Sequence, residues 1–128
     1  MPIAFWCILI ALFLPYLGTG LAKFAGRDFG PRQNRDPRSF LEGLAGYRRR
    51  AHNFQLNSFE VTPAFAIAVM VAYVVGNAEP TTIDRLAMAW IISRLIYMIC
   101  YLADLAMLRS LVWFIGMALI ASFFVVSA

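Results

Sequence analysis

The sequence predicts an all-α integral membrane protein, with residues 1–128 forming a single four-helix bundle domain. Hydrophobic residues make up 62% of the 128-residue chain, whereas soluble domains contain roughly 45–50% apolar residues. The excess is concentrated in long blocks, and a helix needs about 20 such residues to cross a bilayer. We therefore expect four transmembrane helices, at about residues 3–24, 48–75, 83–107 and 111–128.

The first two helices follow from the positions of charge and proline. No charged residue lies between Ile3 and Ala22. This block lacks the basic start of a signal peptide, so we expect it to be retained and to bend at Pro15. The second apolar run, Val61 to Gly76, is shorter than the ~20 residues of a spanning helix. Its helix must therefore begin earlier, which places Asn57 and Glu60 at membrane depth.

The third and fourth helices differ in polarity. The third is expected to begin with Thr81 or Thr82 as its N-cap and to carry polar side chains on one face, spaced three, four and three residues apart: Arg94, Tyr97, Tyr101 and Asp104. Residues 108–110 predict a short return to the fourth helix. That helix contains no charge, so we expect it to pack only against lipid and neighbouring helices.

Basic residues are concentrated between the first and second blocks, which hold eight of the eleven: Lys23, Arg27, Arg32, Arg35, Arg38, Arg48, Arg49 and Arg50. The positive-inside rule predicts that this loop is cytoplasmic and that both termini lie outside. Nucleic-acid binding is disfavoured, because no aromatic interleaving or known basic motif accompanies the charge. Both cysteines lie in apolar segments and His52 is the only histidine, so no metal site is expected.

The start of the second helix carries a polar stripe. With about 100° per residue, its members share an arc of about 100°: Arg49, Arg50, Asn53, Asn57 and Glu60. His52 lies on the side opposite Asn57, so we expect it at the surface or at the membrane interface and not in a catalytic role. A charged residue inside a bilayer costs roughly 2.5–3.5 kcal/mol, and Glu60 and Arg94 could offset this cost as an architectural ion pair. The remaining polar groups have a cationic surplus, which favours an anionic ligand instead.

Three pieces of the chain resemble the superfamily of membrane-associated proteins in eicosanoid and glutathione metabolism (MAPEG). The first is Arg50-Ala51 followed by Asn57-Ser-Phe-Glu60, similar to the family's Asn-x-x-Glu on helix two. The second is Arg94-Leu-x-Tyr97-x-x-x-Tyr101-Leu on helix three. The third is Arg109-Ser110, similar to an Arg-Ser near the start of the family's helix four. With the four-helix layout, these pieces cover nearly the whole chain.

The resemblance implies a homotrimer that binds glutathione as a co-substrate between neighbouring subunits, on the cytoplasmic side. It implies residues for the glutathione carboxylates and amine, namely Arg50, Asn57, Glu60, Arg94 and Tyr97, with Asn53 and Tyr101 as further candidates. Arg109, together with Ser110, would stabilise the thiolate. The pattern is closest to the family's bacterial branch, which implies location in the bacterial inner membrane.

Two functions are open at this point. The first is a membrane-bound, glutathione transferase-like protein whose thiolate conjugates a hydrophobic substrate from the lipid or reduces its peroxide. The chemistry agrees with the residue types, because a neighbouring guanidinium favours the thiolate over the thiol. The alternative is a non-catalytic membrane protein that binds anionic lipid headgroups or small anions. A channel or transporter subunit is disfavoured, because the chain contains no repeat or broken helix pair.

Overall fold

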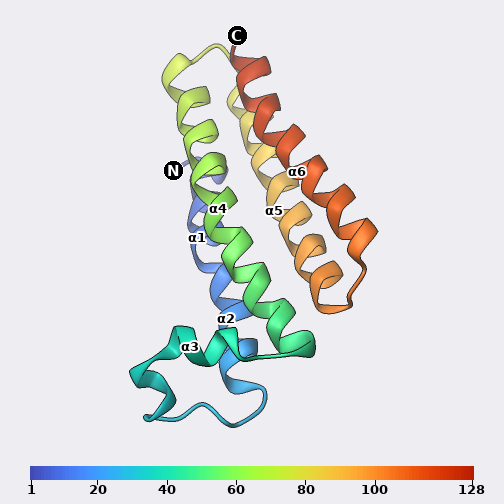
Figure 1. The fold of residues 1–128 in the computed structure, drawn as a ribbon. Coiled ribbons are helices and arrows are strands. Elements are labelled where there is room, and N and C mark those ends of the chain that lie inside the picture. The colour runs from blue at the N-terminus through green and yellow to red at the C-terminus, as the bar shows by residue number, and fades with distance from the viewer.

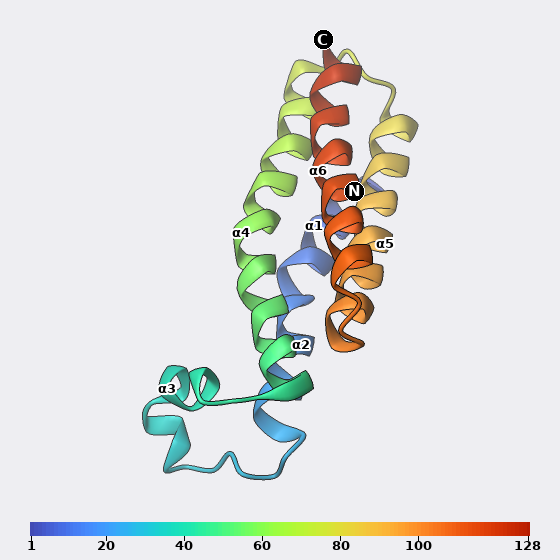
Figure 2. The same cartoon turned by 45° about the vertical axis from the view of Figure 1, so that its right-hand side comes forward.

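The computed structural model describes all residues from 1 to 128, and the chain is helical without strands. The elements, in order, are α1 (Ile3–Phe13), α2 (Pro15–Phe24), a 3-10 turn η1 (Gln33–Arg35), α3 (Pro37–Glu42), α4 (Gly46–Val75), α5 (Pro80–Leu102) and α6 (Ala106–Ser127). The pair α1–α2 and the three long helices run along one another, and α3 lies at one end of the bundle (Figures 1 and 2). Both termini lie toward the opposite end.

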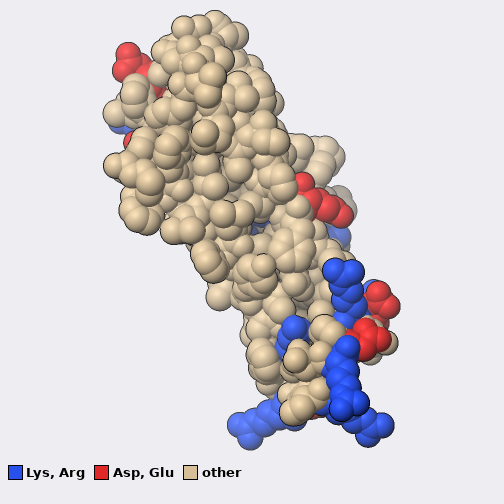
Figure 3. All heavy atoms as spheres, turned by 90° about the vertical axis from the view of Figure 1, so that its left-hand side faces the viewer, with Lys and Arg blue, Asp and Glu red and all other residues tan.

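Four segments are long and apolar enough to cross a membrane: Ile3–Phe24, Gly46–Val75, Pro80–Leu102 and Ala106–Ser127. Many large hydrophobic side chains on these segments face outward, such as Phe13, Val74 and Phe114. Lysine and arginine gather at the end that carries α3, while most of the rest of the visible face is uncharged (Figure 3). This pattern confirms the predicted all-α fold with four helices suited to a bilayer.

The two prolines inside spanning segments behave differently. The first segment is interrupted at Leu14, directly before Pro15, which has no N–H to donate to the preceding turn. In contrast, α4 continues through Pro63 without interruption. The break before Pro15 divides the first spanning segment into two helices, α1 and α2, and α2 packs closely on α4.

The last two helices begin earlier than the sequence suggested. The third ends at Leu102 instead of Met107, and the fourth begins at Ala106 instead of Leu111. Asp104 turns the chain with a φ of +60°, and the backbone N–H of Leu105 donates to the carbonyl of Cys100 at 2.9 Å. Arg109 and Ser110 therefore lie in the first turns of α6 and not in a loop.

Asp84 caps a different helix from the one expected. The N-cap residue of α5 is Glu79, with Pro80 at the first helical position, and neither Thr81 nor Thr82 caps it. The expected threonine cap is wrong because Pro80 already starts the helix. Asp84 instead accepts a hydrogen bond from the backbone N–H of Ala4, with Oδ1 at 2.9 Å. Since α1 has no side-chain cap of its own, this carboxylate satisfies a donor in its first turn.

We expect Asp84→Ala to destabilise the fold by about 1–2 kcal/mol, the usual effect of losing a helix cap. The loss of stability should be confined to the start of α1, where the backbone amides of residues 3–6 should exchange hydrogen faster. Hydrogen-exchange mass spectrometry of the detergent-solubilised protein measures this. Asp84→Asn retains an acceptor oxygen and is the matched control. Unchanged exchange in residues 3–6 of the Asp84→Ala variant would show that this contact does not anchor α1.

The connection between α2 and α4 is held by Arg48. Its guanidinium donates to the carbonyl of Ala22 from Nε at 3.1 Å and from Nη2 at 2.8 Å, at the C-terminal end of α2. It also forms an ion pair with Asp28, with Nη2 and Oδ1 2.7 Å apart. The hydrogen bond from Arg48 lowers the pKa of the Asp28 carboxyl. The hydrogen bonds and the ion pair of Arg48 therefore fix the chain that leaves α2.

Aromatic packing divides the bundle into two levels. In the half that contains the termini, Phe65 stacks on Trp90 with ring centroids 4.0 Å apart, and Phe123 packs edge-on against Phe65. Nearer to α3, a second buried cluster contains Leu14, Phe54, Tyr97 and Val112. This second cluster joins all four spanning segments and fixes the position of the polar residues described next.

Candidate functional site

One face of α5 carries the polar residues of the candidate site. Arg94, Tyr97 and Tyr101 follow one another at intervals of three and four residues, which places them on one side of a helix. The rings of Tyr97 and Tyr101 meet edge to face with centroids 5.4 Å apart. Phe54 of α4 packs on Tyr97, and Arg109 of α6 lies over the ring of Tyr101. This row of side chains is therefore held between α4 and α6.

Arg94 is the most deeply buried charge in the bundle, with 4% of its surface exposed. Its Nη2 donates to Oδ1 of Asn57 and to Oγ of Ser58, each at 3.0 Å. The guanidinium also lies over the ring of Tyr97, 4.2 Å from its centroid. Arg94 thus joins α5 to α4 and fixes the position of Tyr97 through a cation–π contact.

A pocket of about 170 Å³ opens between α5 and α6, and we call it the α5–α6 pocket. It is lined by Tyr97, Tyr101, Arg109, Ser110, Trp113 and Phe114. The guanidinium of Arg109 lies 4.3 Å from the ring centroid of Tyr101. Phe114, 66% exposed, forms the side of the pocket that faces outward from the bundle. The pocket therefore combines a cation and hydroxyl groups with an apolar, outward-facing edge.

Arg109 differs from the other arginines that are at least partly buried. Arg48, Arg49, Arg50 and Arg94 each donate a hydrogen bond to an oxygen of the chain. Arg109 makes none, although its guanidinium is held against Tyr101. Its N–H groups are therefore oriented by the ring and still available to an anion that enters the pocket. The hydroxyls of Tyr97, Tyr101 and Ser110 also make no hydrogen bond within the chain.

The structure does not pair Glu60 with Arg94. The ion pair within 4 Å in this chain is the one between Arg48 and Asp28, and Glu60 is exposed without a hydrogen bond. The expected pair is wrong because Asn57 and Ser58, one turn nearer to α3, take the Arg94 guanidinium instead.

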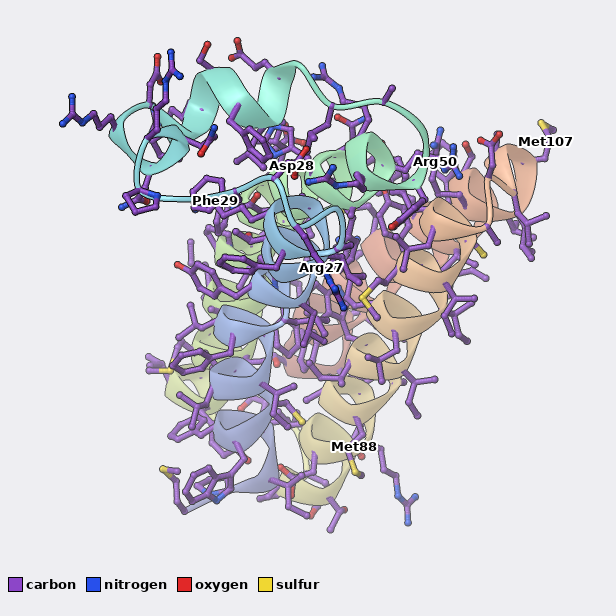
Figure 4. All side chains as sticks on the ribbon, turned by 90° about the horizontal axis from the view of Figure 1, so that it is seen from below. Arg27, Asp28, Phe29, Arg50, Met88 and Met107 are labelled. Atoms are coloured by element: carbon purple, nitrogen blue, oxygen red, sulfur yellow. The ribbon has the colours of Figure 1, made fainter.

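Two further residues of the predicted stripe lie apart from the α5–α6 pocket. Asn53 is partly buried and makes no hydrogen bond. Arg50 donates from Nη2 to the carbonyl of Leu102 at 3.1 Å, and its Nε is buried without a partner. Arg50 thus lies where α4 meets the last turn of α5 (Figure 4), at the end of the bundle that carries α3.

His52 is buried, with 7% of its surface exposed, whereas we expected it to be exposed at the surface or at the membrane interface. Its Nδ1 lies 3.3 Å from Oε1 of Gln55, and both side chains border a hollow of about 720 Å³ between α3 and α4. The helical angle correctly placed His52 away from Asn57. The expectation failed because α3 folds back against this side of α4, which no periodicity within α4 reveals.

Three residues of the site were not predicted from the sequence. Ser58 accepts a hydrogen bond from Arg94, and its only signal was its position beside Asn57. Trp113 and Phe114 line the pocket; Trp113 follows Arg109 by four residues, which places both on one face of α6. The helix begins early enough to include Arg109 and Ser110, and Trp113 and Phe114, within the range expected to contact only lipid and neighbouring helices, line the pocket beside them.

The pocket is too small for a tripeptide. Sites for ligands of drug size usually enclose about 300–1,000 Å³, and this one encloses about 170 Å³. It has room for one end of such a molecule beside the Arg109 guanidinium. Chemically, it offers a positive charge and hydroxyl donors to a group that is negatively charged or becomes so during a reaction.

In a comparison with protein-family models, residues 3–128 match the model described as the MAPEG family. The match covers essentially the whole chain, including all four spanning segments and every residue of the α5–α6 pocket. Comparisons with curated proteins and with solved structures find no match.

Proposed function

The chain belongs to the MAPEG family and is therefore a multi-pass membrane protein of the superfamily named for eicosanoid and glutathione metabolism. On this premise, we propose that it activates glutathione for reaction with hydrophobic substrates. The observation that carries the proposal is that the hydrogen-bond donors of Arg109 are unused. Its guanidinium is fixed on Tyr101 but donates to nothing within the chain. A thiolate placed in the α5–α6 pocket would supply the missing acceptor.

The chemistry follows from the thiol's acidity. A free thiol has a pKa of about 8.5, and its thiolate is the nucleophile. A guanidinium beside the sulfur stabilises the charged form, and does so more strongly away from bulk water. In this proposal Arg109 stabilises the thiolate, and Ser110 and Tyr101 donate hydroxyl hydrogen bonds to it. The sulfur then forms a bond to an electrophilic carbon of the substrate, whose leaving group departs with the electron pair of the bond that breaks.

The remaining polar residues suit the rest of glutathione. Its two carboxylates call for cations, of which Arg50 is available at the α3 end, and its amine calls for a carboxylate, which Glu60 provides. Asn53 and Asn57 provide amide groups on the same helix. Arg94, buried and bonded to Asn57 and Ser58, contributes by holding Tyr97 in position.

Two observations support a binding site that is shared between copies of the chain, as in a homotrimer. The α5–α6 pocket of one chain is smaller than sites for ligands of glutathione's size. Glu60 is exposed at the level of the spanning segment, and a carboxylate there is costly unless protein, water or a ligand covers it. A second copy placed against this side of α4 would both cover Glu60 and enlarge the site.

The substrate's route follows from the outer edge of the pocket. Phe114 and Leu111 are exposed on the lipid-facing side of α6, and neither carries a polar atom in its side chain. An apolar electrophile dissolved in the membrane therefore reaches the pocket without entering water. We place the protein in the bacterial inner membrane, with the basic α2–α4 connection in the cytoplasm and both termini outside. In this orientation, cytoplasmic glutathione can enter the site from the α3 end.

Calorimetric titration of glutathione into the purified protein in detergent tests this proposal. Saturable binding at millimolar concentration or below is expected, with S-methylglutathione binding more weakly because it cannot form a thiolate. The rival function, binding of anionic lipid headgroups without thiol chemistry, predicts the reverse. Under that function phosphatidylglycerol binds while glutathione does not, and this result would exclude the proposed function.

A further inference from the structure

The hollow of about 720 Å³ between α3 and α4 is not used by the proposed function. We call it the α3–α4 hollow. The short helix α3 projects sideways from the bundle beside the start of α4 (Figure 2), and residues of both helices line the hollow. None of them lines the α5–α6 pocket or is assigned to glutathione above. The volume falls within the roughly 300–1,000 Å³ that sites for ligands of drug size usually enclose.

The α3–α4 hollow carries charges of both signs that do not pair with one another. Arg38 and Glu42 come from α3, and Arg49 comes from the first turn of α4. Neither arginine has an acidic partner within 4 Å. Arg49 donates from Nη1 to the backbone carbonyl of Glu42, which holds its guanidinium against α3 and leaves Nε and Nη2 unused. Two cations and one carboxylate are therefore available to a ligand in this hollow.

His52 and Gln55 add neutral polar groups at the buried side of the hollow. They are 7% and 9% exposed, and Nδ1 of His52 lies 3.3 Å from Oε1 of Gln55. With the amide in this orientation its oxygen can only accept, so Nδ1 carries the proton and Nε2 of His52 is an acceptor. Nε2 makes no hydrogen bond in the chain and is not enclosed by it. A donor that enters the hollow can therefore reach this nitrogen.

Apolar side chains extend the hollow along α4 toward the middle of the bundle. Leu56 and Phe59 line it and are 46% and 45% exposed. The 30 residues of α4 measure about 45 Å, whereas the hydrocarbon core of a bilayer is about 30 Å thick. Because the arginines of α4 stand at its start, the excess length lies there, in the layer of lipid headgroups. Arg49 is then at headgroup level, and Phe59 is nearer to the hydrocarbon.

We propose that the α3–α4 hollow binds a phospholipid whose headgroup carries an ammonium as well as a phosphate, as in phosphatidylethanolamine. The phosphate is matched by the guanidiniums of Arg38 and Arg49. The ammonium is matched by the Glu42 carboxylate and His52 Nε2, both of which accept hydrogen bonds. An acyl chain covers Leu56 and Phe59 and removes their apolar surface from water. A headgroup with negative charge alone would leave Glu42 unpaired beside a like charge.

Native mass spectrometry of the protein in lipid-free detergent, titrated with phosphatidylethanolamine, tests this proposal. Saturable binding is expected. Phosphatidylglycerol should bind about tenfold more weakly, because it has no ammonium to donate to Glu42. Glycerophosphoethanolamine, the same headgroup without acyl chains, should not displace the lipid at equal concentration. Equal affinity for the two lipids, or displacement by the soluble headgroup, would overturn the proposal.

Variants of exposed residues separate this site from general attraction to lipid. Glu42→Gln should weaken phosphatidylethanolamine about tenfold without weakening phosphatidylglycerol, whereas Arg38→Gln should weaken both. Arg35→Gln is the matched control, since Arg35 is exposed in η1 and does not line the hollow. It should change neither affinity. Equal affinities for Arg38→Gln and Arg35→Gln, or an equal loss for both lipids in Glu42→Gln, would overturn the proposal.

A phosphatidylethanolamine with a photoreactive diazirine near its headgroup locates the site directly. Peptide mapping should find the label in residues 38–42 and 52–59. Label spread evenly over the spanning helices, or absent from these ranges because a neighbouring copy fills the hollow, would overturn the proposal. Saturating glutathione and the Arg109→Ala variant should leave the labelling unchanged. Failure of the lipid site would therefore leave the proposed thiol chemistry standing, and the converse also holds.

Discussion

Arg109→Ala should lower kcat/KM for conjugation of glutathione to a membrane-soluble electrophile by about 100-fold, or ~2.7 kcal/mol. The guanidinium lies on Tyr101 with its donors free, so its removal takes away the positive charge beside the thiolate while breaking no hydrogen bond within the fold. The melting temperature should therefore change little. Chlorodinitrobenzene is a suitable probe, because displacement of its chloride by the sulfur is followed by absorbance.

Arg109→Lys is the matched comparison. It retains the positive charge but loses the flat guanidinium that stacks on Tyr101, so we expect an intermediate loss of about tenfold. Arg85→Ala removes an exposed arginine near the opposite end of α5 and should leave the rate unchanged. If Arg109→Ala and Arg85→Ala had equal rates, Arg109 would have no part in the chemistry.

Gly18→Ala should cause the largest loss of stability among single-methyl changes in the bundle, about 2–3 kcal/mol. A Cβ at this position would lie 2.6 Å from the carbonyl oxygen of Ala51 and 3.0 Å from Cδ1 of Phe54. A backbone carbonyl in the second turn of α4 is held by the helix and cannot move aside, so α2 must be displaced. The displacement would also disturb Phe54, which packs on Tyr97 of the site.

Gly20 provides the control for this change. It lies on the same helix, and nothing lies within 4 Å of a Cβ built on it. Gly20→Ala should therefore leave the fold unaffected or stabilise it slightly, because alanine favours a helix over glycine. Both variants are compared by thermal unfolding in one detergent. Equal melting temperatures would show that α2 does not pack on α4 as closely as described.

The composition predicted the fold class because apolar length alone selects spanning helices. It did not place the turn between α5 and α6, since Asp104 adopts a positive φ there where no glycine or proline stands. Pro80, by contrast, was a readable signal for the start of α5, as proline is favoured at the first helical position. The early start of α6 decides the site, because it makes Arg109 and Trp113 neighbours on one helix face.

Helical spacing correctly aligned Arg94, Tyr97 and Tyr101, because it depends on a single helix. Partners across helices were harder to predict. Opposite charge suggested Glu60 as the partner of Arg94. In the structure the Arg94 guanidinium lies at the level of Asn57 and Ser58, which are closer to α3 along α4, and it donates to them instead. His52 is buried by α3, whose return onto α4 depends on the conformation of a long connection. Such contacts follow from how the elements pack and not from the pattern within any one of them.

The most direct test of the account is the ionisation state of bound glutathione. Ultraviolet difference spectra of the wild type and Arg109→Ala, titrated with glutathione across pH, report the thiolate by its absorbance. We predict thiolate at neutral pH in the wild type, because Arg109 holds the thiol pKa below its free value of about 8.5. In Arg109→Ala the thiolate should form only near that free value. A bound thiol that stays protonated at neutral pH in the wild type would contradict the account.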